Sequence, residues 1–421
     1  MLGELSIELG HYTSGAPARL SAADRRRHLY LIGKTGTGKS TLLKNLMLAD
    51  LHAGRGFALL DPHGDLAEAV ADATPAWRVN QVIYLDPADL AFPIGFNPLA
   101  GVAPDARPLV AAQITGAFHH IWGESWGPRL EYILMNSLRL LLDAPGSTLL
   151  GLPRLLADDA YRGRLLAHCR DPIVRGFWQE EFAGYHDRLA SEAIAPVQNK
   201  VGTLLSPPAL RNMLGQPKST LHIRRLMDEG HVLIVNLAKG RLGPAPAHLL
   251  GAFLVTAFAQ AAEARVDTPE ADRRDFTLYA DEFQNFATDS FASILSEARK
   301  YRLSLVLAHQ FLGQLPSLLR QAVIGNAGSI VAFRIGAEDS GLIADELGLE
   351  SRRALTDTQN FAAWVKLVDD GVPTEARRIT TMVPEEVEAR KLTAVRNRTR
   401  TRCARPRLVV EGRIERFLAG E

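Results

Sequence analysis

Residues 29–41 read Leu-Tyr-Leu-Ile-Gly-Lys-Thr-Gly-Thr-Gly-Lys-Ser-Thr. A short apolar run enters a glycine-rich loop with the spacing G-x-x-x-x-G-K-[ST], and a helix is expected to begin near Lys39. Glycines let the backbone turn its N–H groups toward a phosphate, and the helix adds the positive end of its dipole. The pattern predicts a nucleoside triphosphate site, with Lys39 at the β- and γ-phosphates and the Ser40 hydroxyl on Mg²⁺. The residues expected to bind the nucleotide are Gly33, Thr35, Gly36, Thr37, Gly38, Lys39, Ser40 and Thr41.

The composition is that of an ordinary soluble globular protein. The chain has 421 residues, of which 47% are hydrophobic and 23% charged, enough to bury a large core. A net charge of +1 gives no overall basic field, so a nucleic acid would have to be contacted through local patches or a channel lining. Cys169 and Cys403 provide neither a disulfide framework nor a metal-ligand spacing, and they indicate a reducing compartment.

No segment of the sequence is expected to cross a membrane. The longest apolar run, residues 249–262, is shorter than the roughly 20 residues that span a bilayer, and its pattern is that of a buried core helix. The first residues lack the basic and apolar regions of a signal peptide. We therefore expect a soluble chain that is cytoplasmic, or held peripherally at the inner membrane by a partner.

Strand-like and helical patterns alternate in the first and last thirds of the chain, which predicts an α/β fold with a parallel sheet. The strand-like runs cover residues 29–32, 56–61, 81–86, 231–237, 276–280, 303–310 and 329–335. The middle of the chain carries helical spacing with proline and glycine breaks, which predicts an all-helical insertion. The predicted parts are an N-terminal segment (1–28), a nucleotide-binding core (29–100 and 228–375), the inserted all-helical domain (101–227) and a basic C-terminal tail (376–421).

Acidic residues follow two of the predicted strands. Asp281 and Glu282 come directly after the run 276–280; the first carboxylate is expected to bind Mg²⁺ and the second to polarise the attacking water. Asp61 and Asp65 follow an earlier strand, where Asp65 is interpreted either as the cap of the next helix or as a site residue. The sequence lacks the Asn-Lys-x-Asp pattern that reads a guanine base, so ATP is favoured as the nucleotide.

Two further residues complete the predicted catalytic set. Gln310 ends the strand-like run after the acidic pair, which is expected to place its amide near the γ-phosphate. Arg299 lies on the intervening helical segment, and we interpret it as a finger that neutralises transition-state charge in the site of a neighbouring subunit. A plain surface arginine is the alternative for Arg299, and Arg302, Arg334 and Arg27 are the other candidates for the finger.

The segment 389–407 contains eight Lys and Arg residues and no acid. Like-charge runs of this kind are typically solvated or disordered, and the alternative is an arm that contacts nucleic-acid phosphates. If the segment is extended, the alternate residues Arg398, Arg400 and Arg402 share one face. Both interpretations of the tail stay open at this point.

As a set, these motifs resemble the HerA/FtsK-type hexameric ATPases, and most closely the coupling ATPases of type IV secretion and conjugation. The blocks that carry the resemblance are residues 26–33, 61–66, 126–129, 281–286, 296–301, 308–310, 325–326 and 333–334. The resemblance implies a RecA-like P-loop NTPase core with an inserted all-helical domain, a ring of six subunits, and ATP hydrolysis that moves DNA through a central channel.

Conjugative coupling proteins usually carry an N-terminal membrane anchor, and no such anchor is expected here. Three hypotheses for function follow, and all of them are ATPases. The first is a DNA translocase that docks on a membrane-anchored secretion component. The second is a HerA-like motor that processes single- or double-stranded DNA, or acts in defence, together with a nuclease. The third is an assembly ATPase that moves protein substrates.

Overall fold

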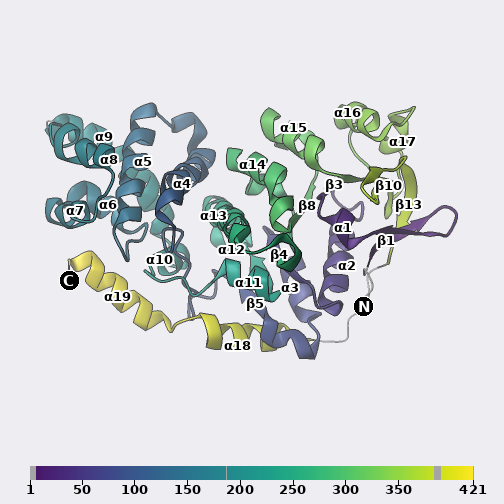
Figure 1. The fold of residues 1–421 in the computed structure, drawn as a ribbon, viewed down its shortest axis with the longest axis horizontal. Helices are drawn as coiled ribbons and strands as arrows, with labels where there is room; N and C mark the ends of the chain where they lie inside the picture. Colours follow the sequence, from purple (N-terminus) through teal and green to yellow (C-terminus); the bar gives the residue numbers. More distant parts are fainter. Residues whose placement is uncertain (1–5, 186, 384–389, 421) are drawn as a thin grey trace. The chain divides into compact units, whose positions relative to one another are not determined.

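The computed structural model describes residues 6–185, 187–383 and 390–420. Parts of three predicted segments lie outside the described residues, namely 1–5 of the N-terminal segment, 186 of the all-helical domain, and 384–389 and 421 of the basic tail. The chain divides into two compact units, and Figure 1 labels many of their helices and strands. Unit 1 comprises Met1–Leu85, Ile223–Ala238 and Phe258–Thr399, and unit 2 comprises Asp86–His222, Lys239–Ala257 and Arg400–Glu421.

The described part of unit 1 is built around an eleven-stranded sheet. Seven neighbouring strands, β9, β3, β8, β7, β4, β6 and β5, run parallel to one another. The remaining four strands, β2, β1, β13 and β10, pair antiparallel with their neighbours and extend the sheet beyond β9. From one edge to the other the strands are β2 (Pro17–Leu20), β1 (Ile7–Tyr12), β13 (Arg377–Thr381), β10 (Ala362–Lys366), β9 (Ser329–Ala332), β3 (Leu29–Ile32), β8 (Leu303–His309), β7 (Phe276–Ala280), β4 (Gly56–Asp61), β6 (Val232–Asn236) and β5 (Val82–Leu85).

The parallel strands are in register along the middle of the sheet. Leu29 of β3 pairs with Val306 of β8, and Leu59 of β4 lies between Tyr279 of β7 and Ile234 of β6. Because the carboxyl ends of parallel strands meet at the same edge, the loops that follow β3, β7 and β8 lie together there. The predicted parallel sheet is confirmed, and one edge of it collects the glycine-rich loop and the acidic pair.

Helices cover the sheet, whose central strands are buried on both faces. Every residue of β3, β4, β7 and β8 is buried. Helix α2 (Lys39–His52) places Leu43 and Met47 in the same hydrophobic core as Leu31. Burial on both faces explains why these strands read as continuous apolar runs. Other helices of unit 1 are α1 (Ala22–Arg25), α3 (Asp65–Asp72), α11 (Ile223–Glu229), α14 (Asp289–Glu297), α15 (Ser317–Asn326), α16 (Ala337–Leu347) and α17 (Arg353–Thr356).

Unit 2 is helical in its described part, apart from an isolated bridge between Ile94 and Ala404. Its helices pack through apolar faces, as where the ring of Phe118 meets that of Phe253 edge to face at 6.1 Å. The helices of unit 2 are α4 (Arg107–Trp122), α5 (Pro128–Asp143), α6 (Gly151–Ala157), α7 (Asp159–Leu166), α8 (Pro172–Gly176), α9 (Asp187–Leu205), α10 (Pro208–Leu214), α12 (Lys239–Leu242) and α19 (Arg407–Ala419).

Helix α13 (Pro244–Glu263) is strongly apolar. By length and composition alone, the helical stretch Pro244–Asp267 is sufficient to cross a bilayer. In the structure, 72% of its most apolar window is buried inside the protein. Burial of this extent agrees with the core helix expected at residues 249–262.

Most described residues of the predicted basic tail lie in helices or in a strand, which corrects the expectation of a disordered or extended segment, while Arg398 and Arg402 are exposed to solvent as expected. Strand β13 lies inside the sheet, and α18 (Leu392–Cys403) and α19 are helices. Arg400 forms a bidentate ion pair with Asp89 (2.7 and 3.0 Å), and Val395 is fully buried. Because α18 is a helix, Arg398 and Arg402 lie on one face, and Arg400, two residues from each, lies on another.

Candidate active site

The glycine-rich loop between β3 and α2 has the backbone geometry that its motif requires. Gly36 (φ +76°) and Gly38 (φ +118°) adopt positive φ values, at which a side chain would be strained. A Cβ atom on Gly33 would lie 2.5 Å from the Cβ of Phe333, so this position also requires glycine. The loop can therefore bend tightly and turn backbone N–H groups toward phosphate oxygens.

Two side chains of the loop bond to the loop's own carbonyl groups. The Thr37 hydroxyl donates to the carbonyl of Lys34 (2.7 Å). The buried Lys39 ammonium donates to the carbonyls of Gly33 and of Lys34, the latter at 3.3 Å. Burial lowers the pKa of Lys39, and the neighbouring acidic pair opposes this shift. A bound phosphate would compete with these two carbonyls for the Lys39 ammonium.

A cavity of about 310 Å³ opens on this loop. Of the predicted site residues, Gly33 and Thr37 belong to the loop but not to the cavity lining, and Arg299 is not part of the lining either. All other predicted nucleotide, metal and catalytic residues meet here. The lining residues are Thr35, Gly36, Gly38, Lys39, Ser40, Thr41, His63, Asp281, Glu282, Gln310 and Phe361.

Asp281 follows β7 and is buried beside the cavity. Burial raises the pKa of Asp281 to about 7, the carboxylates of Glu282 and Asp61 add to the rise, and Lys39 acts against it. One oxygen of Asp281 accepts the backbone N–H of Glu282 (3.1 Å). A buried carboxylate in this negative surrounding is stabilised in its charged form by an added cation. The donor set therefore fits a divalent cation bound by Asp281 and the Ser40 hydroxyl.

Glu282 has a strained backbone and a fixed carboxylate. Its φ of +46° costs about 1 kcal/mol or more for a residue with a side chain, and such residues cluster at functional sites. Its Oε1 accepts from Nε2 of Gln310 (3.0 Å), and its Oε2 accepts from Nε2 of Gln284 (2.7 Å). The Asn285 amide donates to the Glu282 carbonyl (2.6 Å) and holds this turn. A carboxylate held in this way can take a proton from a water molecule that attacks a bound phosphate.

Asp61, rather than Asp65, caps helix α3. The two carboxylate oxygens of Asp61 accept the backbone N–H groups of His63 (2.9 Å) and Ala67 (2.8 Å). Asp65 is the first residue of the helix, and its side chain is exposed. The interpretation of Asp65 as the cap is therefore wrong, because the helix starts one residue earlier than its apolar pattern indicates.

Arg299 lies at the amino ends of the parallel strands, whereas this cavity lies at their carboxyl ends. It belongs to the turn Ala298–Tyr301 directly before β8, whereas Gln310 directly follows β8. The seven residues of β8 span about 20 Å at roughly 3.3 Å per residue. The Arg299 side chain is exposed, and it has no hydrogen-bond or ion-pair partner among the described residues. Arg299 therefore cannot complete the cavity of its own chain.

The other candidate arginines divide between the two ends of the parallel strands. Arg302 directly precedes β8 and Arg27 precedes β3, so both lie at the amino ends, as Arg299 does. Arg302 also pairs with acidic residues at 3.6 and 3.8 Å. Arg334 follows β9, and its carbonyl accepts the backbone N–H of Lys34 (2.8 Å). Arg334 is thus placed beside the glycine-rich loop of its own chain.

Two lining residues are not among the predicted site residues: His63, which lies in the motif block 61–66, and Phe361, which belongs to no motif. Phe361 adopts φ +62°, its N–H donates to the Thr37 carbonyl (2.8 Å), and its Cδ1 would lie 3.1 Å from a Cβ on Gly38. The residue is 46% exposed. An exposed aromatic ring beside a phosphate loop offers a flat surface to a nucleobase. The antiparallel pairing of β10 with β9 brings Phe361 to the loop, and this pairing has no local signal.

Comparison with known proteins gives one family match and several structural ones. Residues 7–99 match the family described as "Helicase HerA, central domain". The unbound bacterial conjugative coupling protein TrwB aligns with a TM-score of 0.64 at 17% identity, over 91% of this chain and 90% of that chain. TrwB in complex with ADP and Mg²⁺ gives 0.63 at 18% identity, over 92% of each chain. VirB4 of Thermoanaerobacter pseudethanolicus gives 0.61 at 15% identity, over 90% of this chain and 96% of that chain. No curated protein sequence matches this chain.

These matches confirm the predicted fold class, a RecA-like P-loop ATPase fold with mostly parallel strands and additional helices. The family match covers residues 7–99 only, and the structural matches relate the fold to those of the conjugative coupling protein TrwB and of VirB4, in agreement with the resemblance that the sequence motifs indicate. At sequence identities of 15–18%, these structural matches show a shared fold and do not by themselves show a shared function.

Proposed function

We propose that this chain is a Mg²⁺-dependent ATPase that moves DNA and hydrolyses ATP between the subunits of a ring. The observation that carries the ATPase part is the Glu282 carboxylate, which two amide groups hold in the same cavity as Lys39 and Ser40. A phosphate-binding loop alone can hold a nucleotide, whereas a fixed carboxylate beside the loop can also activate water.

The residues around the cavity divide the steps of hydrolysis among them. Lys39 and the loop N–H groups bind the phosphates. Ser40 and Asp281 would hold Mg²⁺, which neutralises phosphate charge when it is bound. Glu282 takes a proton from water while the water oxygen bonds to the γ-phosphorus, and the bond to the β,γ-bridging oxygen breaks to leave ADP and inorganic phosphate. Gln310 keeps the Glu282 carboxylate oriented.

The cofactors of a solved relative in fold support this assignment. TrwB has been solved with ADP and Mg²⁺ and has the same fold as this chain. The cavity here offers a partner for each of these ligands: a phosphate loop for the nucleotide, and a hydroxyl–carboxylate pair for the metal ion. ATP and Mg²⁺ are therefore the nucleotide and the metal ion that we propose for it.

The placement of Arg299 supports hydrolysis at an interface between subunits. Its exposed guanidinium is separated from its own phosphate loop by the length of β8, so it can neutralise phosphate charge only in another subunit. The test mixes Arg299→Ala chains with Lys39→Ala chains, each expected to be inactive alone. A mixed ring contains interfaces with one intact Lys39 and one intact Arg299, so ATPase activity should return. Mixtures that stay inactive would contradict a role in trans.

The matches to the HerA helicase domain and to a conjugative coupling protein support DNA as the substrate that is moved. The test measures ATP hydrolysis without nucleic acid and with single- or double-stranded DNA at low salt, together with DNA binding. We expect at least one form of DNA to stimulate hydrolysis. Neither binding nor stimulation would contradict DNA movement and would favour an ATPase that moves protein.

A further inference from the structure

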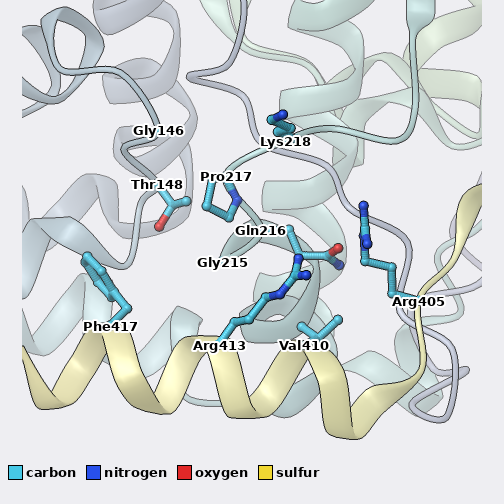
Figure 2. Close-up of a pocket in the computed structure, with 10 residues that line it drawn as sticks. All are labelled: Gly146, Thr148, Gly215, Gln216, Pro217, Lys218, Arg405, Val410, Arg413 and Phe417. Carbon is cyan, nitrogen blue, oxygen red and sulfur yellow. The ribbon is translucent and has the colours of Figure 1, made fainter. Parts of the chain in front are cut away.

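A second cavity, of about 250 Å³, lies within unit 2 (Figure 2). The C-terminal helix α19 and the residues leading into it border one side, and the loop that follows α10 borders the other. Arg405, Arg413 and Lys218 contribute positive charge to the lining, and Val410 and Phe417 contribute apolar surface. The cavity therefore combines the two kinds of surface that an amphipathic anion requires.

Hydrogen bonds between segments remote in the sequence fix the walls of this cavity. The buried Asn97 amide donates to the carbonyls of Ser147 (2.9 Å) and Pro217 (3.1 Å), which ties together the two loops beside the cavity. Asn212 of α10 donates to the Glu411 carboxylate of α19 (3.0 Å). These bonds hold the C-terminal helix against α10 and the loop that follows it, so hydrogen bonds within unit 2 fix the shape of the cavity.

The cations of this cavity lack counter-charges. Val410, Arg413 and Phe417 recur every three or four residues and line one face of α19. Among the described residues, the side chains of Arg405, Arg413 and Lys218 have no hydrogen-bond or ion-pair partner. All three side chains are exposed, so they are available to neutralise an anion that enters the cavity.

We infer that this cavity binds a nucleoside monophosphate unit. Its phosphate would lie between Arg405, Arg413 and Lys218, because guanidinium groups bind phosphate oxygens in a fork. Its base would lie against Phe417 and Val410, which provide a surface that inorganic phosphate alone does not use. A volume of about 250 Å³ lies just below the range of about 300–1,000 Å³ that is typical of ligand sites, so the cavity has room for no more than one such unit. The unit is either a free nucleotide or one residue of a DNA strand.

The test uses the full chain carrying Lys39→Ala, so that the phosphate loop does not compete for the probes. Binding of dTMP, thymidine and a (dT)10 oligonucleotide without terminal phosphate is measured by isothermal titration calorimetry at low salt. We expect the phosphate-bearing probes to bind and thymidine not to bind. Arg413→Glu and Arg405→Glu should each weaken binding at least about tenfold, since each removes one of the phosphate donors. Arg416→Glu, on the same helix but outside the lining, is the matched control and should leave binding unchanged.

The outcomes separate the two sources of the ligand. Binding of dTMP without binding of (dT)10 identifies a free nucleotide, and binding of (dT)10 identifies a residue of a strand. Either result supports the site when Arg413→Glu weakens the binding at least about tenfold. If Arg413→Glu does not fold, Lys218→Ala in the exposed loop takes its place, and Arg413→Lys should retain partial binding. Equal binding by the Arg413 and Arg416 variants, binding of thymidine as tight as that of dTMP, or no binding of any probe would overturn the inference.

Discussion

Replacing Glu282 with glutamine removes the proposed proton acceptor while keeping the shape of the cavity. In the native protein both carboxylate oxygens accept amide N–H groups, from Gln284 and Gln310. A glutamine at this position has only one oxygen, so one neighbour must present its own oxygen instead. Gln284 can do so by rotating its amide, because its Oε1 is buried without a partner among the described residues. We therefore expect Glu282→Gln to change the free energy of unfolding by less than about 1 kcal/mol.

The expected loss is in turnover. A positioned general base contributes about 10²–10⁴ in rate, which corresponds to roughly 3–5 kcal/mol of activation free energy. Nucleotide binding should persist or tighten, because the Glu282 carboxylate is one of the groups that raise the pKa of Asp281. Without that charge Asp281 ionises more readily and binds Mg²⁺ better.

Phosphate release at saturating MgATP measures kcat, and titration with a fluorescent ATP analogue measures affinity. Asp65→Asn is the matched control, since Asp65 is an exposed carboxylate that follows a neighbouring strand and lies outside the cavity lining. It should retain the wild-type kcat. A Glu282→Gln protein whose kcat stays within about threefold of wild type would refute the assignment of Glu282 as the general base.

Three further perturbations test other features of unit 1. Asp50 is fully buried and accepts two hydrogen bonds from Arg25. Asp50→Ala should therefore lower the free energy of unfolding, measured by urea denaturation, by about 3–5 kcal/mol. A loss below about 1 kcal/mol would contradict a stabilising buried ion pair. In the protein without nucleotide or Mg²⁺, the pKa of Asp281 is raised to about 7 from 3.8, so the folded state keeps a proton that the unfolded chain releases between these values. The free energy of unfolding of the wild type, compared with that of Asp281→Asn, should therefore fall by up to about 4 kcal/mol as the pH rises from about 4 to 7, and then level off. If urea denaturation shows the same difference between the two proteins at about pH 5 and at about pH 8, burial does not raise this pKa. Phe361→Ala should weaken ATP binding about tenfold and Phe361→Trp should not, because stacking on a base is worth about 1–3 kcal/mol; equal affinities of wild type and Phe361→Ala would exclude base stacking.

The local parts of the active site could be predicted from the sequence because their chemistry is local. A loop that turns its N–H groups toward a phosphate needs glycine at Gly36 and Gly38 in any fold. Asp281 and Glu282 follow the mostly apolar run Phe276–Ala280, which predicts a buried strand, and the alternation of strands with helices then predicts a parallel sheet. Which residues share the phosphate-loop edge follows from strand direction alone.

The antiparallel end of the sheet could not be predicted in the same way. Strand β2 has only four residues, and β13 pairs with β1 from the other end of the sequence. Such pairings depend on the free energy of the whole sheet, and short segments carry little periodic signal of their own. The same applies to α18, where Arg400 is neutralised by Asp89, a residue remote in the sequence.

By itself, the sequence determined that this protein has a phosphate loop, an acidic pair at a strand end and an α/β core around them. Only the tertiary structure decided that Gln310 and Gln284 fix the Glu282 carboxylate, that Phe361 joins the cavity, and that Arg299 faces away from it. The physical reason is the same in each case. A glycine loop or a strand end is dictated by neighbouring residues, whereas the contacts of these side chains depend on pairings between segments tens to hundreds of residues apart.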